Sequence, residues 1–175
     1  TTLFRSIEPS YEFTITDKTP TTTTPGLNFY GWSLTGDSLS DIYTAGQKFT
    51  ATSVNTTLKA VWGYKKYTIT YNKNMDASVA VNNFVPSQIC IVTTSNGTTC
   101  NAKITERIPN AEGYSLLGWS ATQYIPREGD TIDTARNHVE YKPGDPINLV
   151  NNITLYAVWW SVNQNDWQIE LRWGE

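Results

Sequence analysis

Two cysteines and one histidine are the side chains of this 175-residue chain whose types most readily do chemistry. His138 would need acidic partners to act as a general base or to help hold a metal. Its nearest acidic neighbours in the chain are Asp130, Asp133 and Glu140. Their spacing matches no catalytic triad and no metal-ligand pattern, so we expect His138 to be a solvated loop residue.

No other constellation in the sequence indicates a reaction. A glycosidase would need two carboxylates about 5–10 Å apart in a cleft, and the acidic residues here are scattered without a recognisable motif. The glycines are isolated and form no phosphate-binding loop or dinucleotide fingerprint, and no calcium-binding loop is present. The sequence therefore predicts no catalytic residue, no cofactor, no metal site and no enzyme activity.

Cys90 and Cys100 flank Asn96-Gly97, a dipeptide typical of a β-hairpin turn. A two-residue turn there would point the two sulfurs to opposite faces, whereas a longer loop centred on Ser95 would place the cysteines opposite each other. A bridge needs Cα atoms within about 7 Å, so the turn is decisive. A bridge within the chain, a bridge between subunits and free thiols all stay open. An oxidised pair would suit an extracellular protein.

Three glycosylation sequons begin at Asn55, Asn96 and Asn152. Such triplets arise easily in a chain rich in Asn and Thr, so they are a weak indication of a secreted glycoprotein. The first residue is Thr and no signal peptide is recognisable, which suggests a mature or trimmed chain.

Composition narrows the class of protein. Aromatic residues make up 13% and charged residues 17% of the chain, with a net charge of −3. No basic tract is visible, so nucleic acid is not an expected partner. No stretch approaches the roughly 20 apolar residues of a membrane helix, so we expect no membrane span. Abundant Thr, Val, Ile, Tyr and Trp favour strands.

The chain repeats itself. The matching segments, in the same order in both copies, are Gly26–Ser33 with Gly113–Ser120, Tyr43–Gln47 with Tyr141–Asp145, Asn55–Trp62 with Asn152–Trp159, and Phe13–Thr16 with Tyr67–Thr70. We infer a first module over residues 1–63, a second over 64–160 and a C-terminal segment over 161–175. The second module carries extra residues at about 74–110 and 123–140, which we expect to be surface insertions.

The repeated segments have the alternation of half-buried strands. A glycine inside the apolar run Phe29–Trp32 predicts a bulge or a close approach of backbone. Helix of normal length is absent from the pattern, and residues 38–43 and 130–136 have room for one turn each. The predicted fold is mainly β, with two small tandem antiparallel modules and little or no helix.

The order Gly-aromatic-x-Leu/Phe-x-Gly-Trp-Ser, Tyr-x-x-Gly and Leu-x-Ala-Val-Trp resembles the Listeria–Bacteroides repeat, the family that includes the internalin B-repeats. Segments Tyr114–Trp119 and Leu155–Trp159 carry the likeness best. The resemblance implies β-grasp-like modules of secreted or cell-surface proteins without catalytic activity. The residues around the two cysteines and Asn72-Lys73-Asn74 depart from the family pattern.

Seven tryptophans are distributed unevenly along this pattern. Trp32, Trp62, Trp119 and Trp159 occupy equivalent positions of the two modules, so we expect them in the cores. Trp160, Trp167 and Trp173 are outside the repeated signature and are candidates for a subunit interface.

A strand pattern follows the second module. Four large apolar residues alternate along it, Trp167, Ile169, Leu171 and Trp173. It looks like the first strand of a third module whose remainder is absent. Such a strand either folds back onto its own module or adds to a sheet of a neighbouring subunit, and the N-terminal segment Leu3–Ile7 could act in the same way.

These features predict an extracellular, cell-surface structural protein. The preferred form is a self-assembling subunit of a surface filament, sheath or surface layer, whose main partners are other copies of itself. The alternative is an adhesion or ligand-binding repeat module that acts as a monomer within a larger surface protein and binds a host or cell-surface protein or glycan.

Overall fold

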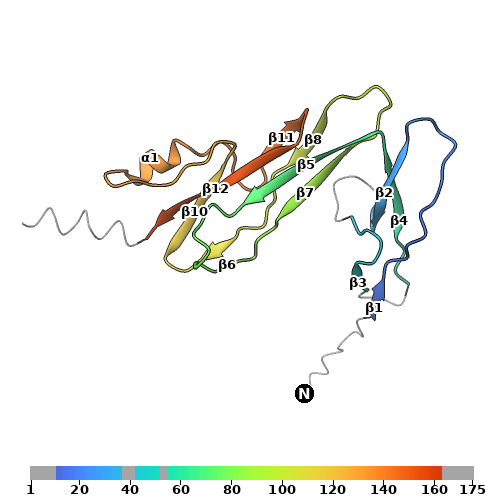
Figure 1. Ribbon diagram of the computed structural model, residues 1–175, viewed down its shortest axis with the longest axis horizontal. Helices are drawn as coiled ribbons and strands as arrows, with labels where there is room; N and C mark the ends of the chain where they lie inside the picture. The colour runs from blue at the N-terminus through green and yellow to red at the C-terminus, as the bar shows by residue number, and fades with distance from the viewer. Residues whose placement is uncertain (1–10, 37–41, 52–54, 163–175) are drawn as a thin grey trace, which may run out of the picture. The chain divides into compact units, whose positions relative to one another are not determined.

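The computed structural model describes residues 11–36, 42–51 and 55–162, and within these ranges the chain is mainly β with one short helix. The strands are β1 (Tyr11–Thr14), β2 (Asn28–Ser33), β3 (Lys48–Ala51), β4 (Lys59–Gly63), β5 (Lys65–Asn72), β6 (Val81–Asn82), β7 (Ser87–Val92), β8 (Cys100–Lys103), β9 (Asn110–Ala111), β10 (Tyr114–Ser120), β11 (Pro146–Leu149) and β12 (Ile153–Ser161), and the helix is α1 (Ile132–Arg136) (Figure 1). The predicted mainly β fold is confirmed, and α1 is the turn of helix expected at 130–136.

The chain divides into two compact units. Unit 1 contains the described residues up to Lys66 together with Ile91–Thr98, and unit 2 contains Tyr67–Cys90 and the described residues from Thr99 onward. No helix among the described residues is long and apolar enough to cross a membrane. The expected C-terminal strand and the segment Leu3–Ile7 lie outside the described residues.

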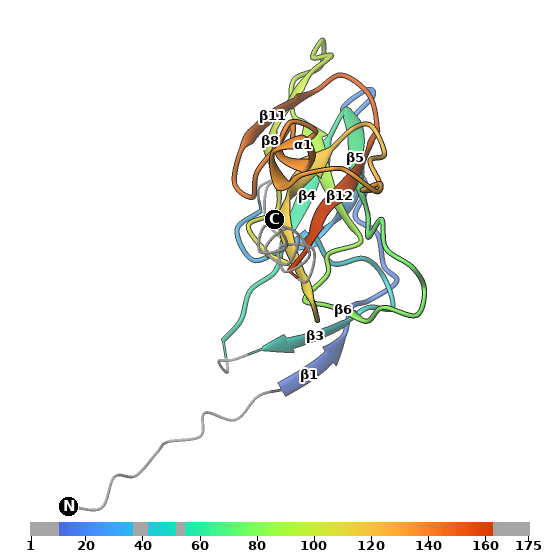
Figure 2. The same ribbon diagram turned by 90° about the vertical axis from the view of Figure 1, so that its left-hand side faces the viewer.

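Unit 1 contains two small antiparallel sheets. β1 pairs with β3 (Figure 2), and β2 pairs with β4 (Figure 1). A cluster of Ile15, Phe49 and Ala51 forms its core, with Trp32 and Leu58 partly buried against it. Every second residue of β3 is buried, which is the alternation expected of a strand with one face on a core.

Unit 2 is built around a longer sheet in the order β6-β9-β10-β12-β5-β7, with β11 and β8 forming a separate pair. Ile69, Leu155 and Ala157 are completely buried on its central strands. β12 pairs with β10 antiparallel and with β5 in parallel. The expectation of purely antiparallel modules is therefore wrong for β5 and β12, because the chain between them is long enough to return in the same direction.

The same strand register occurs in both units. β2 pairs with β4, and β10 with β12, each with a bulge at a glycine of positive φ, Gly31 at 143° and Gly118 at 157°. A Cβ at Gly118 would lie 2.6 Å from the carbonyl oxygen of Tyr141, and one at Gly31 would lie 2.7 Å from that of Tyr43. The close backbone approach predicted from the glycine is confirmed in both copies.

The first block of the repeat must be realigned. Ile15 donates its N–H to Gln47 and accepts from Gly46, and Ile104 makes the same pair of bonds with Asp145 and Gly144. The structural counterpart of Phe13–Thr16 is therefore near Ile104, and the match to Tyr67–Thr70 was wrong. Within the described residues of unit 1, no strand corresponds to β5.

The two inserted segments are more than surface features. Residues 74–110 contain β7 and β8, and three residues of β7 are buried: Cys90, Ile91 and Val92. Residues 123–140 contain α1, and Tyr124 with Ala135 packs on β12 against Trp160. Trp160 is only 4% exposed, so its proposed place in a subunit interface was wrong, since the second insertion covers it.

Candidate functional site

His138 is exposed and lies in local structure rather than in a catalytic arrangement. Its ring stacks on Tyr124 with centroids 4.1 Å apart. The Tyr124 hydroxyl donates to Asp130 Oδ2 at 2.9 Å, and burial together with this bond raises the pKa of Tyr124 to about 12. The other two predicted partners point elsewhere, because Asp133 pairs with Arg136 and Glu140 accepts hydrogen bonds from Ser120 and Ala121.

Asp130 accepts hydrogen bonds from residues of its own loop rather than from His138. Hydrogen bonds from the Arg127 backbone N–H and the Tyr124 hydroxyl hold the pKa of Asp130 below its usual value. These bonds close the turn that leads into α1. Across residues 11–36, 42–51 and 55–162, no three His, Cys, Asp or Glu side chains gather closely enough to hold a metal ion.

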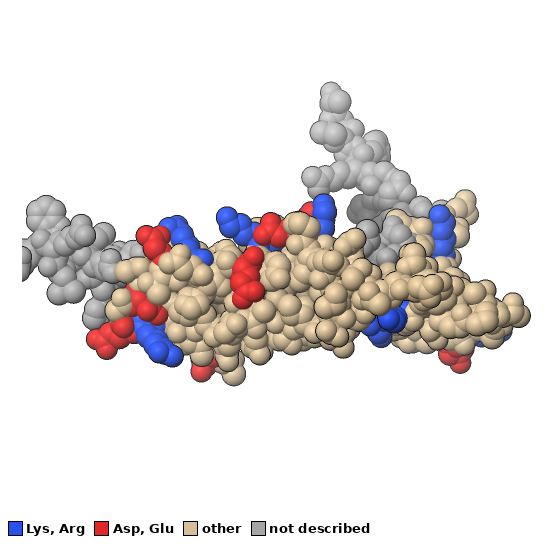
Figure 3. Space-filling view, turned by 90° about the horizontal axis from the view of Figure 1, so that it is seen from above, with Lys and Arg blue, Asp and Glu red and all other residues tan. Residues whose placement is uncertain are grey.

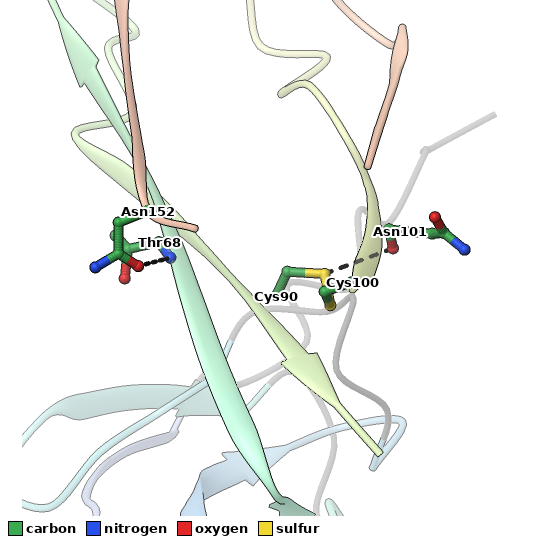
Figure 4. The surroundings of a disulfide bond; sticks show 5 residues. All are labelled: Thr68, Cys90, Cys100, Asn101 and Asn152. Carbon is green, nitrogen blue, oxygen red and sulfur yellow. Dashed lines mark hydrogen bonds between the residues drawn. A yellow bond between two sulfur atoms is a disulfide. The ribbon is translucent and has the colours of Figure 1, made fainter. Parts of the chain in front are cut away.

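Cys90 and Cys100 form a disulfide within the chain, with Cα atoms 6.0 Å apart (Figure 4). The predicted hairpin does not occur, because β7 pairs with β5 and β8 pairs with β11. The turn is closed from Gly97 N–H to Thr94 O, so its centre is Ser95-Asn96 and not Asn96-Gly97. Cys90 Sγ also lies 3.5 Å from Asn101 O, a close contact only, since an oxidised sulfur carries no hydrogen.

The disulfide stands where the chain passes between units. Unit 2 ends at Cys90 and resumes at Thr99, and the intervening residues belong to unit 1. There Tyr64 N–H donates to Val92 O at 2.8 Å, and Ile91 and Val92 are each 3% exposed. The bond therefore closes the base of a loop whose residues Ile91 and Val92 are buried in unit 1.

All three sequon asparagines are exposed, but their surroundings differ. Asn96 lies in the turn between the cysteines, and Asn55 precedes β4. Asn152 occupies the position equivalent to Asn55 and accepts a hydrogen bond from Thr68 N–H at 2.9 Å, which joins the residue before β12 to the middle of β5 (Figure 4). That bond makes Asn152 a structural residue of unit 2, whatever its modification.

Unit 2 has an open groove of about 670 Å³. Tyr114 and Ile125 present exposed apolar surface along it. Its amides are engaged inside the protein: Asn74 donates to the carbonyls of Tyr124 and Ala157 and accepts from Gln123. The groove has the size of a ligand site, but these amide groups already bond one another and the backbone. On the face seen in Figure 3, acidic and basic side chains are interspersed without a large patch of one sign.

The strands that carry the repeated Ala-Val-Trp signature differ in their neighbours. β12 lies between β10 and β5, whereas within the described residues β4 pairs only with β2. β12 begins at Ile153, but β4 begins only at Lys59, so the segment equivalent to the start of β12 is not strand in unit 1. In unit 2 that starting segment is the one that pairs with β5.

Burial follows the same difference. Trp119 and Trp159 are 1% and 4% exposed, and Leu155 is completely buried. Their counterparts Trp32, Trp62 and Leu58 are only half-buried. The predicted core role therefore holds fully in unit 2 and partly in unit 1. In unit 2 the ring of Tyr71 on β5 lies 4.7 Å from that of Trp119, so the strand missing from unit 1 is also the one that covers the tryptophan.

We call the edge of β4 (Lys59–Gly63) that faces away from β2 the open edge of unit 1, because no other strand among the described residues pairs with it. Sequence reasoning did not find it, because the first blocks of the repeat were paired incorrectly. The only indication of it in the sequence was that the first half of the first repeat copy is shorter than that of the second copy. Comparison with models of protein families, with curated proteins and with solved structures finds no match for this chain.

Proposed function

We propose that this chain is a non-catalytic structural protein of the cell exterior, and that it assembles with copies of itself by strand addition into a filament, sheath or surface layer. The observation that carries the proposal is the open edge of unit 1, with half-buried side chains at positions that unit 2 buries. An unpaired strand edge beside apolar surface is a site of association unless something covers it.

Strand addition satisfies two needs of such an edge at once. Main-chain hydrogen bonds from an incoming strand pair the N–H and C=O groups along such an edge, and its alternate side chains cover apolar surface. Covering the exposed part of Trp32 and Leu58 adds roughly 25 cal/mol of stabilisation for each Å² removed from water. The C-terminal sequence has the alternation that this role requires.

The location is proposed on two further observations. The Cys90–Cys100 disulfide suits an oxidising compartment, and the asparagines of all three sequons are accessible. The resemblance to the Listeria–Bacteroides repeat supports the same location, since that family belongs to secreted and surface proteins.

The test is the size distribution of the purified chain by analytical ultracentrifugation, with and without residues 166–175. We expect the full chain to form large species and the shortened chain to remain small. A matched pair of variants refines it. Ile169→Ser with Leu171→Ser changes the apolar face, and Gln168→Ser with Glu170→Ser changes the opposite face of the same segment. Assembly that survives deletion of residues 166–175 contradicts the proposal.

The groove of unit 2 favours a second candidate, an adhesion or ligand-binding module that acts as a monomer and takes a protein or glycan. That function predicts a stable monomer at all practical concentrations. It also predicts binding on a glycan array or to surface protein that is lost in Tyr114→Ala and Ile125→Ala and kept in Val150→Ala, an exposed residue outside the groove.

A further inference from the structure

We infer that the groove of unit 2 binds an uncharged glycan, whose sugar rings pack on Tyr114 and whose hydroxyls donate hydrogen bonds to Asp76. This inference rests on the second candidate function and names the ligand of its site. The described residues that line the groove all belong to unit 2, so one compact unit supplies the site. Its volume of about 670 Å³ lies within the range of about 300–1,000 Å³ that small ligands occupy.

The groove begins where β5 leaves β12. The parallel pairing of the two strands ends at Tyr156, and the chain after β5 turns at Asn74, which has a φ of 48°. Asn74 Nδ2 donates to Ala157 O at 2.9 Å, so a side-chain amide instead of a strand meets β12 at this point. Beyond it β12 pairs only with β10 among the described strands, and Trp159 and Ser161 line the groove.

The walls of the groove are held in place by bonds within the protein. Asn74 also donates to Tyr124 O at 2.7 Å and accepts from Gln123 Nε2 at 2.8 Å, which ties the second insertion to the end of β5. Trp159 Nε1 donates to Lys73 O at 2.7 Å, and this tryptophan is only 4% exposed. Because these groups are bonded before a ligand arrives, binding does not have to order them, and its entropic cost is lower.

Tyr114 and Asp76 remain to meet the ligand. Tyr114 is 37% exposed, and an exposed aromatic ring packs well against the C–H face of a sugar. The hydroxyl and the N–H of Ser78 donate to Asp76 Oδ1 at 2.7 and 2.8 Å. These bonds hold the pKa of Asp76 below its usual value, so it is an acceptor-only carboxylate at neutral pH. Within the described part of the chain, Asp76 Oδ2 and the Tyr114 hydroxyl form no hydrogen bond, so both can bond sugar hydroxyls.

The charge of the groove selects among glycans. Asp76 is the one charged side chain among the described residues that line it. A glycan that carries carboxylate or sulfate groups would meet this negative charge with no Lys or Arg of the lining to offset it, so an uncharged glycan is favoured.

The bonding of the groove also favours a glycan over a peptide. A peptide added along β12 would gain its affinity from main-chain hydrogen bonds. The first acceptor that it would meet beyond β5, Ala157 O, already accepts from Asn74. A glycan needs no ladder of main-chain partners and uses the side chains that are left.

Isothermal titration calorimetry of the full chain tests the ligand. The uncharged probes are cellohexaose, maltohexaose and chitohexaose, and the acidic probe is a hyaluronan hexasaccharide. We expect the best uncharged probe to bind about tenfold more tightly than hyaluronan. Asp76→Asn removes the charge and keeps an acceptor oxygen, so it should narrow this preference.

A matched pair of tyrosine variants tests the site. Tyr114→Ala should weaken binding of the best uncharged probe about tenfold, because the stacking surface is lost. Tyr11→Ala should leave binding unchanged, since Tyr11 is an exposed tyrosine of unit 1, 42% exposed and outside the groove.

Each contrary result has its own consequence. Hyaluronan binding as tight as that of the uncharged probes, or glycan binding that Tyr114→Ala leaves intact, would overturn the inference. No binding of any probe, together with capture of a surface protein that Tyr114→Ala abolishes, would overturn the glycan and leave the second candidate function standing. Neither kind of ligand at the groove would overturn both. Sedimentation of the same samples reports assembly separately.

Discussion

The two units carry the same signature on strands with different neighbours. In unit 2, β12 has a partner strand on each side and begins at Ile153. Trp119 and Trp159 are buried there. In unit 1, β4 is shorter, pairs among the described residues only with β2, and leaves Trp32 and Trp62 half-buried. The difference teaches that the repeated residues specify an antiparallel strand pair and its bulge, while the extent of the strand and the burial of the tryptophans depend on a further strand.

The largest expected effect concerns what the units share. Gly118→Ala would place a Cβ 2.6 Å from Tyr141 O at a φ of 157°, and Gly31→Ala would do the same against Tyr43 O. We expect each to destabilise its own unit by about 3–5 kcal/mol, because strain and overpacking add. Urea unfolding followed by residue-resolved NMR assigns the loss to one unit or the other.

Gly113→Ala is the control for this pair. Its φ is also positive, at 76°, but nothing lies within 4 Å of the new Cβ. The backbone penalty alone is about 1 kcal/mol. If Gly118→Ala were no more costly than Gly113→Ala, the close backbone approach would not be what requires glycine.

The next effect separates the units. Trp119→Ala should cost unit 2 about 3–5 kcal/mol, the usual range for a fully buried tryptophan. Trp32→Ala should cost unit 1 about half of that, because much of its ring is already in water. Equal losses in the dispersed chain would indicate that unit 1 is complete without a further strand. In assembled protein the cost of Trp32→Ala should rise towards that of Trp119→Ala.

Local signals made much of this fold predictable from sequence. The alternation in the repeated blocks predicts the β fold, and the glycine before Trp32 and Trp119 predicts the bulge, because each depends on residues close in the chain. The disulfide partner of Cys90 was harder to predict from the sequence. Asn96-Gly97 indicates a hairpin, but β7 and β8 choose distant partners, β5 and β11.

Features that depend on tertiary neighbours could not be predicted in this way. Trp160 is buried by α1 and Tyr124, which come from a segment that has no counterpart in the first copy. The open edge of unit 1 is visible only when Ile15 is aligned with Ile104 through their hydrogen bonds. Sequence similarity alone had paired that segment with β5 and so concealed the missing strand.

The disulfide gives a smaller effect that reaches both units. Cys90→Ala with Cys100→Ala should lower the free energy of unfolding by about 2–3 kcal/mol, because the closed loop is short, with ten residues of sequence separation. The apolar residues Ile91 and Val92 belong to unit 1, so amide hydrogen exchange should accelerate there as well as around the cysteines. Ile91→Ser leaves the bond intact and should affect unit 1 alone. Exchange unchanged at Ile91 and Val92 in the double variant would contradict this coupling.

The smallest effect is alkaline and concerns the strand that unit 1 lacks. Tyr71 on β5 accepts from Thr105 N–H at 2.9 Å, and burial raises the pKa of its hydroxyl from 10.0 to about 12. A pKa that is higher in the folded state stabilises the fold fully below pH 10, and this contribution is lost as the pH rises through 12. At pH 11 the loss for Tyr71 is about 1.4 kcal/mol, one unit of pH between the two pKa values. Tyr71→Phe should therefore flatten the dependence of unit 2 stability on pH between 10 and 12, even though it weakens unit 2 at neutral pH by removing the hydrogen bonds of the hydroxyl to Thr105 and Gln88. Tyr124 retains its own raised pKa and supplies the remaining slope. A slope unchanged by Tyr71→Phe would mean that this hydroxyl ionises as readily in the folded chain as in the unfolded one. The Tyr71 side chain would then not be buried on β5, as it must be if it covers Trp119.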